Sequence, residues 1–454
     1  MTLRLYDTKS RQLKEVASHR GATSMYCCGP TVYRDAHVGN LRTFLLADLI
    51  SRALTLSGIK VSLVQNITDV GHMSEDFQED DKILTQAQIE KIDPYEIARK
   101  YEEKFHHDLS RLNIKKAMVY PKASESIELM QSMIAELIEK DCAYLGNDGS
   151  VYFDAHSYPG YGELSGNRID ALKPGHKHEV SEDTAKRFHA DWALWKAAGK
   201  RSEMIWPSPW GPGFPGWHIE CSAMSMEILN SHVDVHVGGI DLRFPHHENE
   251  RAQSNAITGQ ESVDIWVHGE HLLFEGRKMS KSSGNVLLLQ DVIDRGLDPL
   301  ALRLCLLENR YRSQMDLTWS SIQAAHELLL RWRGKLSEWA GSEPSVNLWE
   351  VDSEIESAIN NDIDTPKILI RLRAIEKSDQ KNKRALFMYA DQILGLNLDQ
   401  GVEEKTLTEQ MKELLDARSI ARSEKRWSDS DDLRVQLEGL GLIIKDTPEG
   451  QTWS

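Results

Sequence analysis

Three short segments of the chain carry residue types that hold zinc in proteins. Cys28 lies in YCCGPTVY, Cys221 in PGWHIEC, and His246 and Glu250 in FPHHENE. His246 and Glu250 are four residues apart, so on a helix they would share one face, as paired metal ligands require. Any one of these residues alone is better explained as an ordinary buried cysteine or as part of a capped polar helix start. Together, two thiolates, an imidazole and a carboxylate favour a tetrahedral zinc site.

The segment around Cys28 has the pattern of a strand, a helix and a second strand. Residues 26–33 are predicted as a buried strand that runs into a loop, and HVGN, residues 37–40, precedes a helix. Gly58 is expected to end that helix, and a second apolar strand follows at 60–67. Such units build parallel sheets, and the free amides of the helix N-terminus favour phosphate. His37 could also serve only as the helix cap.

A second candidate for phosphate binding lies more than two hundred residues further on. The segment GRKMSKSSGN, residues 276–285, is a loop of small residues that carries Lys278 and Lys281 beside Arg277. Taken by itself, it is equally compatible with a solvated basic loop.

These motifs, taken together, resemble a known family. HVGN with KMSKS resembles the two ATP-binding signatures of class I aminoacyl-tRNA synthetases. YCCGPTVYRDAHVGNLRTF, SPWGPGFPGWHIECSAM and DLRFPHHENE resemble segments of cysteinyl-tRNA synthetases, and NITD, DWALWK, WVHGEHL and KDTPEGQTW extend the resemblance nearly from end to end. The resemblance implies an α/β fold, with a Rossmann-type class I synthetase catalytic domain that contains an α/β insertion, followed by an all-helical C-terminal tRNA-binding domain.

The changes of pattern along the chain suggest domain limits. We expect the catalytic domain at 1–315 with its insertion at about 111–190, a helical stem-contact or linker region at 316–340, and a helical anticodon-binding domain at 341–454. The insertion is predicted to hold a helix at 124–140 and a hairpin around GNDGS. The segment 341–347 is the predicted linker.

The resemblance also implies the reaction. A cysteine–tRNA ligase activates L-cysteine with ATP to cysteinyl adenylate and pyrophosphate, and then transfers cysteine to the 3′ end of cysteine tRNA. Charge develops on phosphate oxygens, so donors are needed rather than a nucleophile. The expected catalytic and ATP-binding residues are His37, Asn40, Lys278 and Lys281, with Mg²⁺ carried by ATP.

One Zn²⁺ per subunit would select the substrate, because a thiol binds zinc as a thiolate and the hydroxyl of serine is a poor ligand. Cys27 adjoins Cys28 and is an alternative ligand, but in the family the cysteine directly before glycine binds the metal. The implied metal ligands are therefore Cys28, Cys221, His246 and Glu250.

The family pattern places a cysteine-binding pocket around this metal. Its implied residues are Gly29, Thr31, Thr68, Trp217, His236 and Asp241, while His218 and His247 flank the ligands and could relay protons. Trp217 could instead be a core residue, His236 a buried histidine, and His247 a partner that orients a ligand. An acidic insertion at about 71–79 separates NITD from DDKI, which run almost together in the family.

The tail of the chain matches the family where the anticodon is read. Splayed RNA bases stack on aromatic side chains and are hydrogen-bonded at their edges. The matching residues are Arg422, Trp427, Asp431, Asp446 and Trp453, although packing of both tryptophans within a small domain is an alternative. A basic segment at 367–384 is either a local RNA contact or a solvated helix face.

Composition limits the remaining possibilities. The net charge of −16 argues against a protein coated with nucleic acid, so contacts to tRNA must be local. Five cysteines and no apolar leader or membrane-spanning run predict a cytoplasmic protein, which we expect to be a monomer. The alternatives are a cysteine:amino-sugar ligase of mycothiol-type thiol biosynthesis and a non-catalytic tRNA-binding paralogue.

Overall fold

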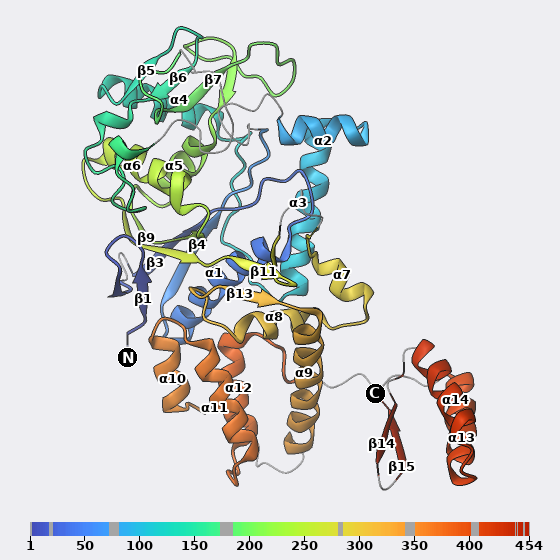
Figure 1. Cartoon of the computed structure of the whole chain (residues 1–454). Coiled ribbons are helices and arrows are strands. Elements are labelled where there is room, and N and C mark those ends of the chain that lie inside the picture. Colours follow the sequence, from blue (N-terminus) through green and yellow to red (C-terminus); the bar gives the residue numbers. More distant parts are fainter. Residues whose placement is uncertain are drawn as a thin grey trace.

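A parallel four-stranded sheet forms the centre of the molecule (Figure 1). The computed structural model describes residues 2–17, 21–71, 81–172, 185–279, 285–340, 350–400, 408–440, 442, 444–447 and 450–453. The strand order is β10-β9-β3-β4. These strands are β3 (Ala22–Cys27), β4 (Lys60–Gln65), β9 (Val233–Gly239) and β10 (Val263–Gly269).

The predicted order of strand, helix and strand near the N-terminus is confirmed, but the first strand lies at 22–27 and not at the predicted 26–33. β3 is followed by α1 (Val38–Leu56) and then by β4, which pairs with β3 in parallel. Two hydrogen bonds end α1, from the Gly58 amide to the Thr55 carbonyl and from the Ile59 amide to the Leu54 carbonyl. Gly58 has a φ of 78°, so a glycine suits this Schellman turn.

The order in which strands are added to the sheet reverses at β3. α1 carries the chain from β3 to β4 on one side, whereas β9 and β10 lie on the other side of β3. In open α/β sheets, ligands bind beyond the carboxyl ends of the strands at such a point. The carboxyl ends of β3, β9 and β10 therefore mark the place where a site is expected.

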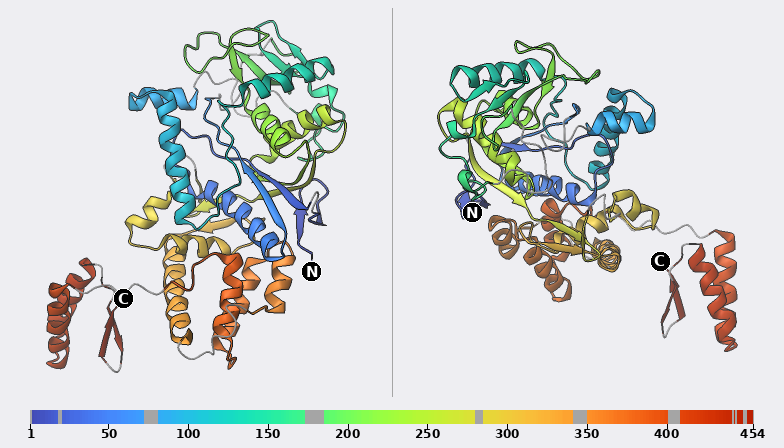
Figure 2. Two further views of the ribbon diagram at one scale, coloured as in Figure 1. Left: turned by 180° about the vertical axis from the view of Figure 1, so that it is seen from behind. Right: turned by 45° about the horizontal axis from the view of Figure 1, so that its top comes forward.

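An insertion lies above the sheet in Figure 1, and Figure 2 shows it from behind and with the top of the molecule tilted forward. The predicted helix and hairpin are both present in it, as α4 and the antiparallel pair β5 and β6. Its core includes Phe153 and Trp192, whose rings stack at 4.4 Å. The elements from β4 to the end of the insertion are α2 (Lys82–Glu90), α3 (Pro94–Arg111), α4 (Ile127–Glu139), β5 (Ala143–Leu145), β6 (Val151–Phe153), β7 (Trp192–Ala197) and β8 (Gly213–Pro215).

The helices below the sheet share one core with it. Leu329 and Trp332 of α9 and Phe387 of α12 belong to the same buried cluster as the apolar face of α1. The helices predicted from the 3.6-residue pattern after KMSKS are thus present; α11 and α12 contact α9, and α10 packs on α11. The elements are α7 (Leu289–Asp294), α8 (Pro299–Leu307), α9 (Trp319–Ala340), α10 (Ser353–Asn360), α11 (Thr365–Lys377) and α12 (Lys383–Leu394).

Smaller sheets complete this part of the chain. β1 (Arg4–Asp7) and β2 (Gln12–Glu15) form a hairpin, and β11 (Leu272–Phe274) pairs with both β12 (Arg277–Lys278) and β13 (Met315–Leu317).

The C-terminal unit has a core of its own, which includes Leu415, Leu437, Leu442 and Ile444. Both views in Figure 2 draw this unit apart from the rest. Its helices are α13 (Glu409–Ser423) and α14 (Trp427–Gly439), and an antiparallel hairpin of β14 (Ile444–Thr447) and β15 (Gly450–Trp453) follows them. The helical C-terminal region is confirmed, but the expectation that it is helical throughout is corrected by this hairpin.

None of the described helices is long and apolar enough to cross a membrane.

Candidate active site

The four predicted metal ligands meet in one buried cluster. Their ligand atoms all lie within 4.8 Å of one another, and all four side chains are buried. The Cys28 Sγ lies 3.9 Å from the Cys221 Sγ and 3.5 Å from the Glu250 Oε1. The His246 Nε2 lies 3.0 Å from the same carboxylate oxygen. Residues more than two hundred positions apart thus converge on one point.

Three elements bring these ligands together. Cys28 directly follows β3, at the point where the strand order reverses. Cys221 lies on α5 (Trp217–Ile228), which begins beside the sheet. Glu250 lies in the first turn of α6 (Glu248–Thr258), and His246 lies one turn before it. The predicted spacing of four residues therefore puts both of these ligands on one face.

The acidic groups of the cluster need a nearby cation in order to ionise. Burial raises the pKa of the Cys28 thiol and of the Glu250 carboxyl, because the ionised forms lose their hydration. The hydrogen bond from Cys28 lowers the pKa of Cys221 to about 7. Two thiols and a carboxyl without an adjacent buried cation are costly to ionise, and a divalent metal would remove that cost. A donor set of two sulfurs, one nitrogen and one oxygen fits zinc.

Cys27, the alternative ligand, is not part of the cluster. Its side chain belongs to the core on the α1 side of the sheet, whereas Cys28 belongs to the cluster on the α5 side. The Gln65 amide donates to the Cys27 sulfur at 3.7 Å, and burial raises the pKa of Cys27 to about 12.

Two further histidines border the cluster. The Nε2 atoms of His236 and His247 lie 3.5 and 3.3 Å from the Cys28 Sγ. Burial lowers the pKa of both imidazoles, which keeps them neutral. Through its Nδ1 atom, 2.8 Å from the His268 Nε2, His247 is also tied to β10. His268 was not predicted as a site residue, and its place in WVHGEHL was the signal that could have indicated it.

His246 is held on its outer side. The indole of Trp217 stacks on its ring with 4.2 Å between centroids, and the His218 Nδ1 lies 2.8 Å from the His246 Nδ1. Ring stacking and this hydrogen bond fix the orientation that the Nε2 atom needs to face the cluster.

A pocket of about 390 Å³ runs from the cluster to the start of α1. It opens beyond the carboxyl ends of β3, β9 and β10, where the strand order reverses. Thr68 and His236 are not part of the lining that the described residues make. Thr68 is buried, and its hydroxyl donates to the Glu220 carboxylate at 2.9 Å. The predicted residues that line the pocket are Cys28, Gly29, Thr31, His37, Asn40, Trp217, Asp241 and Lys278.

Gly29 is required by a close approach of the backbone. A Cβ atom at this position would lie 1.6 Å from the Asn66 carbonyl oxygen. The Gly29 amide also donates to the Asn66 side chain at 2.8 Å. A side chain at residue 29 would therefore displace the strand end that carries Cys28.

The far end of the pocket combines a helix start and a basic strand. His37 is the N-cap of α1, and its Nδ1 accepts a hydrogen bond from the Asn40 amide at 3.2 Å. Burial lowers the pKa of His37, so the neutral ring carries its proton on Nε2. Lys278 is exposed on β12, and Lys281 lies outside the described residues.

The predicted anticodon residues lie in the C-terminal unit. Arg422 forms an ion pair with Asp446 at 3.1 Å, and its guanidinium lies 5.7 Å from the Trp427 ring centroid. Trp427 is 56% exposed, so it is not a core residue, and Asp431 is exposed as well. Only the backbone of Trp453 is described, in β15 opposite Ile444.

Comparisons with known proteins agree with this architecture. Residues 14–327 match the family model of the class I (C) tRNA synthetase catalytic domain, and residues 404–453 match that of the cysteinyl-tRNA ligase anticodon binding domain. The cysteine–tRNA ligase of a Thermus thermophilus strain is 39% identical, over 100% of this chain and 99% of its own length. That of Chlorobium chlorochromatii is 37% identical, over 100% and 99%.

A solved structure confirms the fold at low sequence identity. Methionyl-tRNA synthetase of Mycobacterium tuberculosis, in complex with methionyl-adenylate, matches with a TM-score of 0.57 and 12% identity, over 83% of this chain and 90% of that one. Two domain models in the right order and full-length relatives above 30% identity leave one assignment. The chain belongs to the cysteine–tRNA ligase family of class I aminoacyl-tRNA synthetases, which are ATP-dependent ligases.

Proposed function

We propose that this chain activates L-cysteine with ATP and transfers it to the 3′ end of cysteine tRNA, with a zinc ion that selects the amino acid. One observation carries the proposal: a single pocket joins a buried cluster of two cysteines, a histidine and a glutamate to the N-terminus of a helix and to a lysine. The cluster fits a thiol substrate, and the helix start and lysine fit a triphosphate. The bond between cysteine and the nucleotide would form in the part of the pocket between these two groups of residues.

The zinc would be held by Cys28, Cys221, His246 and Glu250. When bound, it would supply a soft Lewis acid that favours the thiolate of cysteine over the hydroxyl of serine. The chain's own residues shape the rest of this end: Trp217 forms a wall of the pocket, and Asp241 lines it with a carboxylate suited to the substrate ammonium. We assign Gly29 and Thr31 to substrate contact, and Thr68 and His236 to the support behind it.

The nucleotide end needs donors placed where charge develops. Neutral His37, which can donate from Nε2, and Gly39 in the first turn of α1 line the pocket, and Lys278 adds a positive charge. We assign Asn40 to the same end, together with Lys281, whose position in the KMSKS motif supports this role. Magnesium would arrive with ATP, since the triphosphate supplies most of its ligands.

The tRNA would be recognised by the C-terminal unit. An exposed indole beside a guanidinium is suited to stack an unpaired base, and we assign Arg422, Trp427, Asp431, Asp446 and Trp453 to the anticodon. An enzyme that passes cysteine to an amino sugar has no use for such a unit, and a silent tRNA-binding paralogue has no use for the buried ligand cluster. The two features together favour the synthetase.

The deciding experiment is transfer of labelled cysteine to a cysteine tRNA transcript, with serine as the competing amino acid. We expect charging by cysteine alone with zinc-replete protein. Cysteine-dependent pyrophosphate exchange without charging would instead indicate the amino-sugar ligase. Absence of both activities in protein that contains zinc would contradict the proposal.

A further inference from the structure

A second group of positive charge lines the same pocket. Arg34 lies in the loop between β3 and α1, and Lys82 is the first residue of α2. Both are half-buried, and both line the pocket with Tyr33. The Arg34 Cζ lies 5.1 Å and the Lys82 Nζ 5.8 Å from the centroid of the Tyr33 ring. Two cations from different elements thus share one aromatic ring at the pocket wall.

The neighbouring carboxylates are engaged elsewhere. Asp35, next to Arg34, forms an ion pair with Lys104 at 2.9 Å. Asp81, next to Lys82, pairs with Arg201 at 2.8 Å. Among the described residues, no carboxylate lies within ion-pair distance of Arg34 or Lys82, although the cations around them are paired. Positive charge that is partly desolvated and has no ion-pair partner among the described residues fits an anionic ligand.

The position of Lys82 is fixed by a buried anchor. The Asp81 carboxylate caps α2 through the amides of Ile83 and Leu84. Its partner Arg201 also donates to the Gly71 carbonyl at 3.1 Å and lies 4.0 Å from the Phe214 ring centroid. Because the side chains of Asp81 and Arg201 are both buried, the start of α2 is held against the insertion.

Two substrates of the proposed reaction carry phosphate groups, ATP and tRNA. Lys278 and the start of α1 already provide the positive groups assigned to ATP. Figure 1 shows α2 beside the insertion and well above β11, the strand that precedes the strand of Lys278. The single-stranded 3′ end of the tRNA must enter this pocket to reach the activated cysteine. We propose that Lys82 and Arg34 bind a backbone phosphate of the tRNA 3′ end during transfer. This inference rests on the proposed function.

The test separates the two half-reactions in Lys82→Met. We expect single-turnover transfer from preformed cysteinyl adenylate to tRNA to slow by about tenfold, as loss of one charge-assisted hydrogen bond would cause. Pyrophosphate exchange should keep its rate and its KM for ATP. The salt dependence should also change, since loss of one contact to single-stranded phosphate lowers the slope of log KM for tRNA against log salt by about 0.7.

Matched variants exclude a merely structural role. Lys82→Arg should restore transfer because it keeps the charge, and Lys91→Met should leave it unchanged because Lys91 is exposed at the other end of α2, away from the pocket lining. Normal transfer and an unchanged salt slope in Lys82→Met would overturn the proposal. So would a raised KM for ATP with slower pyrophosphate exchange, which would assign the pair to ATP. A wild-type protein that exchanges pyrophosphate but charges no tRNA would refute the proposed function instead.

Discussion

Adjacent thiols at the end of β3 have opposite surroundings. Successive side chains of a strand point to opposite faces, so Cys27 enters the core beneath α1 and Cys28 enters the ligand cluster beside α5. Only the second thiol meets a second sulfur, a carboxylate and imidazoles. Two residues of one type therefore provide an internal control for the candidate metal site.

We expect Cys221→Ser to lose most of its zinc, since a hydroxyl replaces a thiol of pKa about 7. Discrimination between cysteine and serine should then fall to the roughly 10- to 200-fold that shape alone gives. Metal analysis and aminoacylation with both amino acids would measure this. Cys27→Ser is the matched control and should keep its zinc, so equal loss of metal in both variants would contradict the assigned ligand set.

His37 has two roles in the structure that one substitution can separate. Its Nδ1 caps α1, and its Nε2–H remains free to donate in the pocket. His37→Asn keeps a side chain that caps helices well, so the thermal midpoint should not change. Pyrophosphate exchange should nevertheless fall by about 100-fold, as for loss of one donor to a developing charge.

The two measurements together decide the role of His37. His37→Ala should lose both functions, with about 1 kcal/mol of stability lost with the cap. Pyrophosphate exchange at the wild-type rate in His37→Asn would show that His37 only caps the helix.

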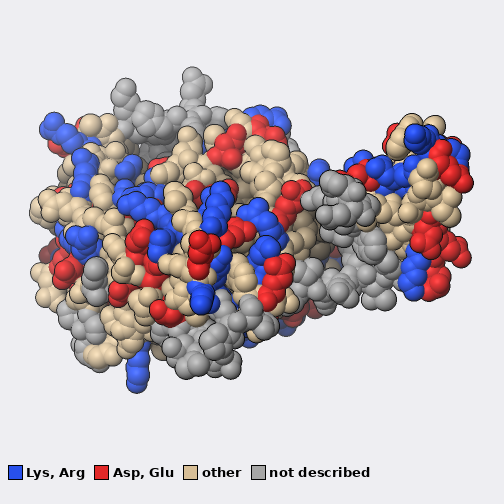
Figure 3. Space-filling view, turned by 90° about the horizontal axis from the view of Figure 1, so that it is seen from below, with Lys and Arg blue, Asp and Glu red and all other residues tan. Residues whose placement is uncertain are grey.

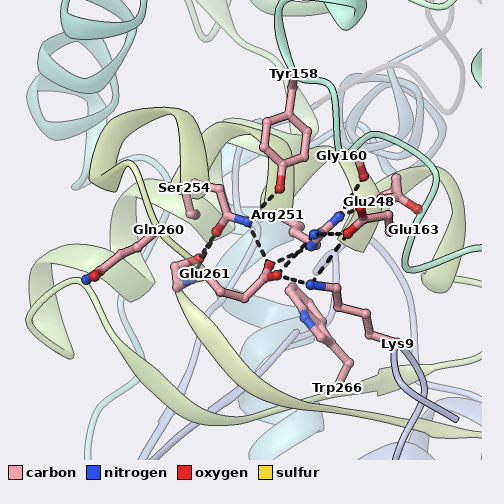
Figure 4. A network of polar contacts seen from close by, with 12 residues as sticks. Lys9, Tyr158, Gly160, Glu163, Glu248, Arg251, Ser254, Gln260, Glu261 and Trp266 are labelled. Carbon is pink, nitrogen blue, oxygen red and sulfur yellow. Dashed lines mark hydrogen bonds and ion pairs between the residues drawn. The ribbon is translucent and has the colours of Figure 1, made fainter.

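At the scale of elements, a network of charges joins the N-terminal hairpin, the insertion and α6 (Figure 4). Arg251, one residue after the predicted ligand Glu250, lies at its centre and is buried. It binds Glu261 at 2.6 Å, Glu163 at 2.7 Å and the Gly160 carbonyl at 2.8 Å. This network holds α6, the helix of the predicted ligand Glu250, against the insertion.

Removal of Arg251 should destabilise the protein. Arg251→Met leaves Glu261 and Glu248 without their main cation, at a cost of about 3 kcal/mol. Denaturant unfolding at neutral pH would measure it, with Arg331→Met as the control. Arg331 is exposed, and its partner Glu376 also accepts a hydrogen bond from the Trp332 indole, so Arg331 should contribute less than about 1 kcal/mol. A cost as small as that of the control would contradict the structural role.

The same network predicts a dependence on pH. Burial alone would raise the pKa of Glu261, but hydrogen bonds from Arg251, Lys9 and Asn255 lower it to about 2, below the usual 4.5. A carboxyl with a lowered native pKa stabilises the fold above its usual value, and this contribution disappears as the pH falls through about 2. The difference between wild type and Arg251→Met should therefore shrink between pH 4.5 and about 2.

The elements differ in how well the sequence predicts them. Apolar residues are dense in α1 and β4, which lie where the sequence predicts a helix and a strand, whereas β3 begins four residues before the strand predicted at 26–33. The hairpin of β14 and β15 was not predicted, because KDTPEGQTW is polar and lacks alternation. The ligand cluster was predictable because cysteine and histidine are rare and their motifs are long. The partners of Arg251 and Lys82 were not, because a charged residue gives no sign in the sequence of which distant residue it contacts.

At the scale of the whole molecule, the charge of −16 is spread rather than segregated. Figure 3 shows basic and acidic side chains interspersed over the face seen from below. Within the basic segment 367–384, Arg371 pairs with Asp352 at 2.8 Å and Arg373 with Glu308 at 2.7 Å. These pairs favour the solvated helix face over an RNA contact, so recognition of tRNA must depend on local features elsewhere.

The C-terminal unit offers one such feature, and Trp427 is the residue that tests it. An exposed indole beside Arg422 contributes little to the core around Leu415 and Leu437, so Trp427→Ala should not change stability. If a base stacks on it, kcat/KM for tRNA should fall by roughly 5- to 150-fold, the value of one stacked base, whereas pyrophosphate exchange should not change. Ile420→Ala removes another exposed apolar side chain of the same unit and should leave both activities intact. Equal effects of Trp427→Ala and Ile420→Ala on charging would show that the unit contributes apolar surface rather than a specific stack. An effect of Trp427→Ala alone would establish that two separately packed parts of the chain act on a single tRNA, one for chemistry and one for recognition.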